Sequence, residues 1–165
     1  MKIKLNSANI LVAEEMPWLI AIMLVLFIFA FVALGLGIAF DGVWEGLLFA
    51  LMGGGLGFAA LCVFVERLQV ILDAREGLIT LRRRTVLKYE QKVLPLDALL
   101  RAEAQWTTSR KDGRTRNLSR PALVVTEDGA EKIYPVTQVY SNGPGTERLV
   151  NAINDWAAQR EKISA

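Results

Sequence analysis

Histidine is absent from this chain of 165 residues, and cysteine occurs once, as Cys62. Without histidine the chain lacks the commonest general base, the usual imidazole metal ligand and the base that activates a serine or cysteine nucleophile. A lone cysteine forms no intramolecular disulfide and builds no metal site from cysteines. These absences disfavour catalysis, although catalysis by Asp or Glu carboxylates needs neither residue and remains possible. We expect no catalytic residue, no metal site and no cofactor.

Charged residues are missing from two long stretches, residues 17–40 and 46–65, which are 24 and 20 residues long. Crossing about 30 Å of hydrocarbon takes roughly 20 apolar residues in a helix. Each stretch therefore predicts a transmembrane helix. A cleavable signal peptide competes for the first stretch, but its apolar core would be about 7 to 15 residues long behind a basic segment. The first stretch is longer and follows Glu14 and Glu15.

The connection between the two stretches, residues 41–45, holds two acids and no Lys or Arg, whereas the chain after the second stretch is rich in arginine. Basic flanks stay in the cytoplasm. The sequence thus predicts a multi-pass protein of the plasma membrane with both termini in the cytoplasm. Residues 1–16 are expected to form a short cytoplasmic segment that lies along the inner membrane surface or frays.

Both apolar stretches contain glycines, of which Gly35, Gly53 and Gly57 are the candidate helix-packing residues. Gly53 and Gly57 are four residues apart and share a helix face, which lets a neighbouring helix approach closely. The neighbour is the other helix of the same hairpin, or else a second copy or another membrane protein. Because no charge interrupts either stretch, transport is disfavoured.

Residues 66–165 alternate apolar and polar residues between turn signals, which predicts a cytoplasmic domain of six to seven strands. Turns ending in or containing glycine are expected at residues 74–77 and 127–130, and the basic segment 109–118 is expected to form a hairpin loop. Residues 96–108 are predicted as a long strand, although LDALLRAEAQ within them also has helical propensity. Further strands are expected at residues 68–73, 78–84, 121–126 and 131–136.

A helix is predicted from an N-cap at Thr146 to about Arg160. Its apolar residues recur at helical spacing: Leu149, Val150, Ile153, Trp156 and Ala157. This face is expected to plug a curved sheet, and a separate partner-binding helix is the alternative. The expected fold class is a membrane α-helical hairpin plus an α+β, mainly β domain, whose bent sheet or partly open barrel is capped by the C-terminal helix.

The order of these parts resembles a known family of small bacterial membrane proteins that carry a pleckstrin-homology-like (PH-like) domain after a transmembrane hairpin. The resemblance lies in the two apolar stretches, then VILDAREGLITLRRR (residues 70–84), LPLDAL (94–99), ALVVTEDGAEKIYPV (122–136) and RLVNAINDW (148–156). It implies a cytoplasmic domain made of a seven-stranded bent sheet with a C-terminal helix, in a protein of the bacterial inner membrane. It also implies a role in binding, oligomerisation or assembly of membrane complexes, as in some photosynthetic-complex assembly factors that combine spans with this domain.

Basic residues are concentrated in residues 67–120, which hold 13 Lys or Arg against 6 Asp or Glu. The candidate lipid-binding or partner-binding residues form two groups: Arg82, Arg83, Arg84 and Lys88, and then Arg110, Lys111, Arg114 and Arg116. In the first group, Arg82 and Arg84 alternate with the apolar Ile79 and Leu81 and so share a basic strand face. Anionic headgroups or an acidic partner fit such clusters. The plainer alternatives are that the first group sets topology and the second is a solvated hairpin tip.

The chain departs from phosphoinositide-binding relatives of the fold, because it lacks a Lys and Arg pair in the first strand-loop-strand unit. Nucleic acid is disfavoured as a partner, since only Trp106 lies near the second basic group. Asp73 with Glu76, and Asp128 with Glu131, flank glycine turns, where acids hydrogen-bond to the backbone.

The sequence therefore favours a non-enzymatic accessory, assembly or scaffolding protein that binds a protein partner or itself, with no small-molecule substrate. The alternatives are an anionic-lipid-sensing module and a membrane-surface enzyme.

Overall fold

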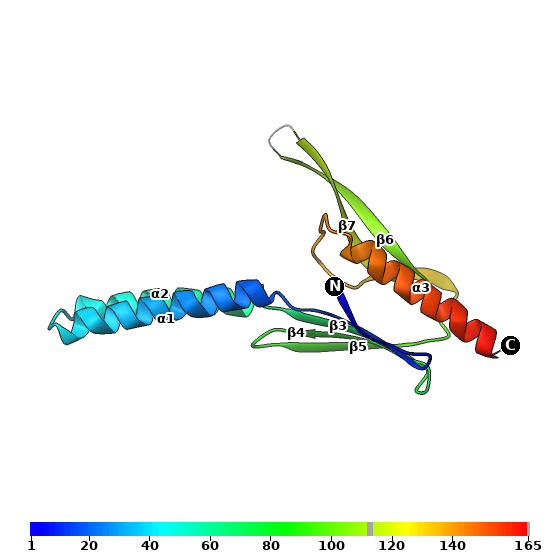
Figure 1. Ribbon diagram of the computed structural model, residues 1–165, viewed down its shortest axis with the longest axis horizontal. Coiled ribbons are helices and arrows are strands. Elements are labelled where there is room, and N and C mark those ends of the chain that lie inside the picture. Colours follow the sequence, from blue (N-terminus) through cyan, green and yellow to red (C-terminus); the bar gives the residue numbers. More distant parts are fainter. Residues whose placement is uncertain (112–113, 165) are drawn as a thin grey trace. The chain divides into compact units, whose positions relative to one another are not determined.

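A computed structural model describes the backbone of residues 1–111 and 114–164, and the side chains of residues 1–110 and 115–160. The chain divides into two compact units. One unit comprises Met1–Glu15, Leu68–Arg82 and Glu90–Ala165, and the other comprises Met16–Arg67 and Arg83–Tyr89. The first holds most of two antiparallel sheets and a C-terminal helix, and the second holds a helical hairpin (Figure 1).

The hairpin consists of two helices, α1 (Trp18–Phe40) and α2 (Glu45–Phe64), which lie side by side (Figure 1). The first ends where Gly42 adopts φ +90°, a left-handed conformation that glycine tolerates without a Cβ clash. Both helices are long and apolar enough to cross a membrane. The two helices predicted from the charge-free stretches are therefore confirmed as helices.

The larger sheet has five strands in the order in which they follow one another along the chain, β1-β2-β3-β4-β5. These are β1 (Lys2–Asn6), β2 (Ile10–Glu15), β3 (Arg67–Asp73), β4 (Leu78–Arg84) and β5 (Tyr89–Pro95). The turn between β3 and β4 ends at Gly77 with φ +66°, as the turn signal predicts. Ile79 on β4 is fully buried whereas Arg82 and Arg84 are exposed, so the alternation read from this strand is confirmed.

The expectation for residues 1–16, a surface segment or a frayed end, is wrong. They form β1 and β2, and β2 pairs antiparallel with β3 from Ile10 opposite Asp73 to Glu15 opposite Leu68. Leu11 on β2 is fully buried in the core. A strand this short has a weak sequence signal, and its pairing partner follows only after both helices, so local patterning does not reveal it.

The helical hairpin is thus an insertion between two neighbouring strands of one sheet. The chain leaves β2 at Glu15, enters α1 at Trp18, leaves α2 at Phe64 and enters β3 at Arg67. Each connection is only two residues long, so the hairpin is covalently joined to the sheet at both of its ends. The sheet cannot form without bringing those two ends together.

The smaller sheet has the order β6-β7-β8. Its strands are β6 (Leu99–Lys111), β7 (Arg114–Glu127) and β8 (Ala130–Pro135). The long strand predicted over residues 96–108 is confirmed as a strand, but it begins three residues later, at Leu99, and extends to Lys111. Pairing with β7 overrides the helical propensity of its first half. The hairpin predicted at residues 109–118 is confirmed, but the extent predicted for its loop is wrong: the strands pair as far as Lys111 opposite Arg114, and residues 112–113 lie outside the described part of the chain.

The C-terminal helix α3 (Gly145–Ser164) packs on β6 and β7, and also contacts β1 and β2. Leu149, Ile153 and Trp156 are buried in one core with residues of both sheets, so the predicted apolar face is confirmed. Trp156 Nε1 also donates a hydrogen bond of 2.7 Å to the carbonyl oxygen of Ser7. This bond attaches the turn between β1 and β2 to the last helix of the chain.

Candidate functional site

The first basic group lies at the turn between β4 and β5. Arg82 and Arg84 are exposed, whereas Arg83 is partly buried and its Nε lies 2.8 Å from Glu66 Oε1. Lys88 closes the turn through its backbone: its carbonyl accepts a hydrogen bond of 2.8 Å from the N–H of Thr85. The four predicted residues are therefore brought together, but Arg83 is engaged with Glu66, the second residue after α2.

The second basic group lies on a two-stranded ribbon formed by the C-terminal half of β6 and the N-terminal half of β7. Arg110 stands opposite Thr115, and Arg116 stands opposite Ser109, so the two arginines point to opposite faces of the ribbon. Both are exposed. Lys111 and Arg114 pair in the backbone register, but their side chains lie outside the described residues. The ribbon is therefore basic on both faces.

Arg120 lies nearer the body of the domain and is held there. Its Nε donates a hydrogen bond of 2.8 Å to Gln105 Oε1, and its guanidinium lies 4.5 Å from the ring centroid of Tyr140. A cation over an aromatic face is stabilised by the ring quadrupole. Arg120 consequently packs against the sheet, unlike the exposed Arg110 and Arg116.

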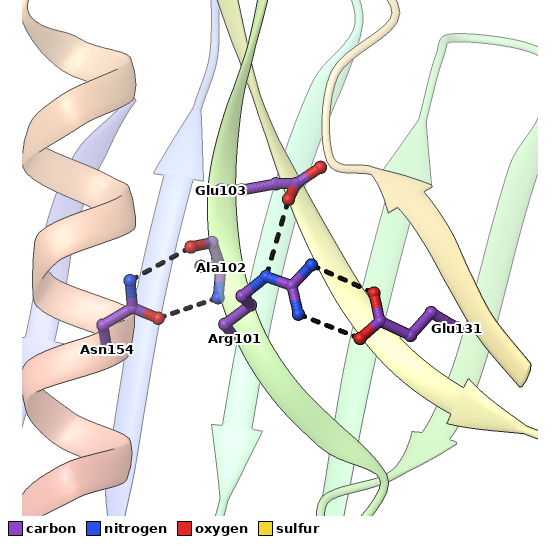
Figure 2. Close-up of polar contacts among 5 residues, drawn as sticks. All are labelled: Arg101, Ala102, Glu103, Glu131 and Asn154. Atoms are coloured by element: carbon purple, nitrogen blue, oxygen red, sulfur yellow. Dashed lines mark hydrogen bonds and ion pairs between the residues drawn. The ribbon is translucent and has the colours of Figure 1, made fainter.

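A charge cluster on the open face of the smaller sheet was not found from the sequence. Arg101 on β6 reaches across β7 and donates two hydrogen bonds to Glu131 on β8, from Nη1 to Oε1 at 3.1 Å and from Nη2 to Oε2 at 3.0 Å (Figure 2). Arg101 Nε also lies 3.7 Å from Glu103 Oε2. The hydrogen bonds with Glu131 raise the pKa of Arg101 and lower the pKa of Glu131.

Glu131 is therefore the partner of an arginine that lies 30 residues earlier, and not half of an acid pair with Asp128. This pairing depends on which strands are neighbours in the sheet, and the spacing of the two residues in the sequence does not indicate it. The pair is exposed, so its two parallel hydrogen bonds fix geometry more than they stabilise the fold. It clamps the two outer strands of the sheet together.

The acidic residues of the turn between β7 and β8, Glu127 and Asp128, are also paired with side chains of β8. Tyr134 donates a short hydrogen bond to Glu127, and Lys132 Nζ lies 3.1 Å from Glu127 Oε2 and 3.6 Å from Asp128 Oδ2. The hydrogen bond from Tyr134 and the bond with Lys132 lower the pKa of Glu127. Lys92 Nζ lies 3.7 Å from the centroid of the Tyr134 ring. A carboxyl group held ionised in this way serves as a strand contact and is a poor proton donor at neutral pH.

The edge of β6 is covered by a side chain of α3. Asn154 Oδ1 accepts a hydrogen bond of 2.7 Å from the N–H of Ala102, and Asn154 Nδ2 donates one of 3.0 Å to the carbonyl of Ala102 (Figure 2). The amide thereby occupies both backbone groups that a pairing strand would use at this position. It blunts the strand edge against association at that point.

The three helix-packing glycines lie at close contacts between α1 and α2. A Cβ added to Gly35 would lie 2.6 Å from Ala50, one added to Gly53 would lie 2.0 Å from Phe31, and one added to Gly57 would lie 2.5 Å from Ile28. The neighbour at this face is thus the other helix of the same hairpin. Gly55 differs, because nothing lies within 4 Å of its added Cβ.

Within the described residues, no three Cys, Asp or Glu side chains are grouped so as to hold a metal ion. No family model and no curated protein matches this chain. What the protein does must therefore be argued from the apolar hairpin, its attachment to the sheet and the exposed basic surfaces.

Proposed function

We propose that this chain is a non-enzymatic membrane accessory or assembly protein whose PH-like domain binds a protein partner or a second copy on the cytoplasmic face of a bacterial inner membrane. The observation that carries the proposal is the apolar surface of the hairpin. Outward-facing side chains such as Leu19, Phe29, Leu51 and Phe64 are well exposed along both helices. An apolar surface of this extent is not stable in water, whereas lipid covers it without penalty.

The attachment of the hairpin supports the same proposal. Because β2 and β3 are paired, both ends of the hairpin are joined to adjacent strands at the same end of one sheet. A helical hairpin that crosses a bilayer twice has both ends on one side, so connectivity and membrane crossing agree. The arginines that follow α2 support a cytoplasmic location for that side.

The two-sheet arrangement supports a PH-like assignment for the domain. Six strands and a closing helix follow the hairpin, where the resemblance implies seven strands and a helix, and two further strands precede the hairpin. The core is filled by apolar residues from both sheets and α3. Such a domain offers its faces and strand edges for binding, and β8 forms one edge of the smaller sheet.

Site-specific photo-crosslinking of the full chain in its native membrane tests the proposal. A photoreactive residue at Ile133, which is exposed on β8, is expected to give an adduct of one discrete mass. The matched control is Val139, an exposed apolar residue in the loop before α3. The absence of an adduct at Ile133 and at the exposed Leu100 on β6 would contradict binding through this sheet.

A lipid-sensing function is the second candidate, and the basic ribbon favours it. Arg110 and Arg116 are exposed on opposite faces, so the ribbon presents positive charge whichever way it lies against an anionic surface. A fluorophore at Ser109→Cys in a Cys62→Ala background reports on contact between the ribbon and lipid in reconstituted vesicles. An emission shift that requires anionic lipid and disappears in high salt would favour lipid sensing. An unchanged emission favours the protein-binding function.

A further inference from the structure

The tight turn between β4 and β5, residues 85–88, has an unusual composition. The N–H of Thr85 donates to the Lys88 carbonyl at 2.8 Å, and the N–H of Lys88 donates to Thr85 Oγ1 at 3.0 Å, which closes the turn. Its two central residues are Val86 and Leu87, which are 49% and 77% exposed. Tight turns favour Gly, Asn, Asp, Ser and Pro for their backbone conformations and hydrogen bonds. Two branched apolar side chains at a solvent-exposed tip contradict that preference.

Basic residues surround the apolar tip. Arg82 and Arg84 precede it and are exposed, Lys88 follows it, and Tyr89 is an exposed aromatic residue next in the chain. Short apolar segments with Lys, Arg and an aromatic residue beside them are typical of surfaces that bind at the membrane interface. The apolar side chains enter the boundary between headgroups and acyl chains, and the cations contact phosphate.

The location of the turn agrees with this chemistry. Residues 83–89 belong to the same compact unit as α1 and α2. Arg83 Nε lies 2.8 Å from Glu66 Oε1, and Glu66 follows the last residue of α2 by only two positions. The turn is therefore held beside the end of a helix whose own surface requires lipid.

We propose that the turn is a membrane anchor in which Val86 and Leu87 insert into the leaflet from which α2 emerges, and Arg82, Arg84 and Lys88 contact the phosphates of anionic lipids. The inference rests on the proposed function, because it requires the hairpin to cross the bilayer. Lipid is the occupant for two reasons. The tip belongs to the same compact unit as the apolar hairpin, and the charge around it complements an anionic headgroup layer.

Depth-dependent fluorescence quenching of the full chain tests the anchor. Leu87→Cys in a Cys62→Ala background is labelled with an environment-sensitive fluorophore and reconstituted into vesicles of phosphatidylcholine and phosphatidylglycerol. The control Val139→Cys carries the label at an apolar residue of almost equal exposure, 76%, in the loop before α3. We expect lipids with shallow quenchers to quench the Leu87 label several-fold more than the Val139 label.

A third label, at Phe58→Cys on α2, separates failure of the anchor from failure of the proposed function. If deep quenchers reach Phe58 but the Leu87 and Val139 labels behave alike, the anchor is refuted and the membrane hairpin stands. If no lipid quencher reaches Phe58, the proposed function fails as well. A Leu87 label that is shielded from aqueous quencher but is not reached by lipid quenchers lies against protein, and this result also overturns the anchor.

The charge component has its own test. In the variant R82Q/R84Q, quenching of the Leu87 label is expected to fall towards the value measured in pure phosphatidylcholine. The double variant R75Q/R148Q, at two exposed arginines that belong to neither basic group, is the matched control and should leave that quenching unchanged. Equal effects of the two double variants would show that the net charge of the domain, and not the arginines beside the turn, attracts it to anionic lipid. That result would overturn the assignment of Arg82 and Arg84.

Discussion

The amide of Asn154 provides a sharp test of how the domain is held together. Ala102 is 4% exposed, so water does not readily replace the two hydrogen bonds that Asn154 makes with its backbone. A net hydrogen bond contributes about 1 kcal/mol, and a buried group left unsatisfied costs about 1–3 kcal/mol. Alanine recovers roughly 0.5 kcal/mol through its better helix propensity. We expect Asn154→Ala to lower the free energy of unfolding by about 2–3 kcal/mol.

The assay is urea unfolding of the full chain in mild detergent, followed by intrinsic fluorescence, to which the buried Trp156 contributes beside the exposed Trp18, Trp44 and Trp106. With a denaturant slope of about 2 kcal/mol per molar urea, the midpoint should fall by about 1 M. Asn151→Ala is the matched control, because it makes the same chemical change in the same helix at an exposed position. Its midpoint should stay equal or rise slightly. Equal midpoints for the two variants would refute the argument that Asn154 protects the edge of β6.

Three further predictions concern other contacts. Gly57→Leu should force α1 and α2 apart and lower the thermal stability of the hairpin, measured by helical circular dichroism in detergent, whereas Gly55→Leu should be tolerated. Trp156→Phe removes one hydrogen bond and should speed amide hydrogen exchange in β1 and β2 with little change in β7. The lowered pKa of Glu131 gives stability that is complete above the ordinary glutamate pKa of about 4.3 and is lost as pH falls through the folded-state pKa. Glu131→Gln should remove that acid-sensitive component from midpoints measured against pH, and an unchanged pH profile would contradict the pairing with Arg101.

Much of the fold was predictable because its signals are local. The two charge-free stretches specify helices by length alone, and the face with Ile153 and Trp156 specifies one side of α3 by its spacing. The alternation in β4 likewise predicts which side is buried. In each case a window of one element contains the complete pattern.

The parts that sequence reasoning missed all depend on contacts between distant residues. The pairing of β2 with β3 is invisible until both helices are removed from between them, so the two N-terminal strands were not foreseen. Arg101 with Glu131, and Asn154 with Ala102, join residues on separate elements. Val86 and Leu87 attract no attention in the sequence, because two apolar residues in a β-rich region resemble core. Their exposure becomes informative only when the turn is seen.

A hairpin that crosses the membrane in the proposed orientation keeps both attached strands on the cytoplasmic side. Cysteine labelling of the full chain in intact cells with a membrane-impermeant maleimide tests it directly. In a Cys62→Ala background, Val43→Cys in the connection between α1 and α2 should be labelled from outside, and Val139→Cys should be labelled only after lysis. Labelling of Val139→Cys in intact cells, or protection of Val43→Cys until lysis, would show that the hairpin does not cross the membrane in this orientation.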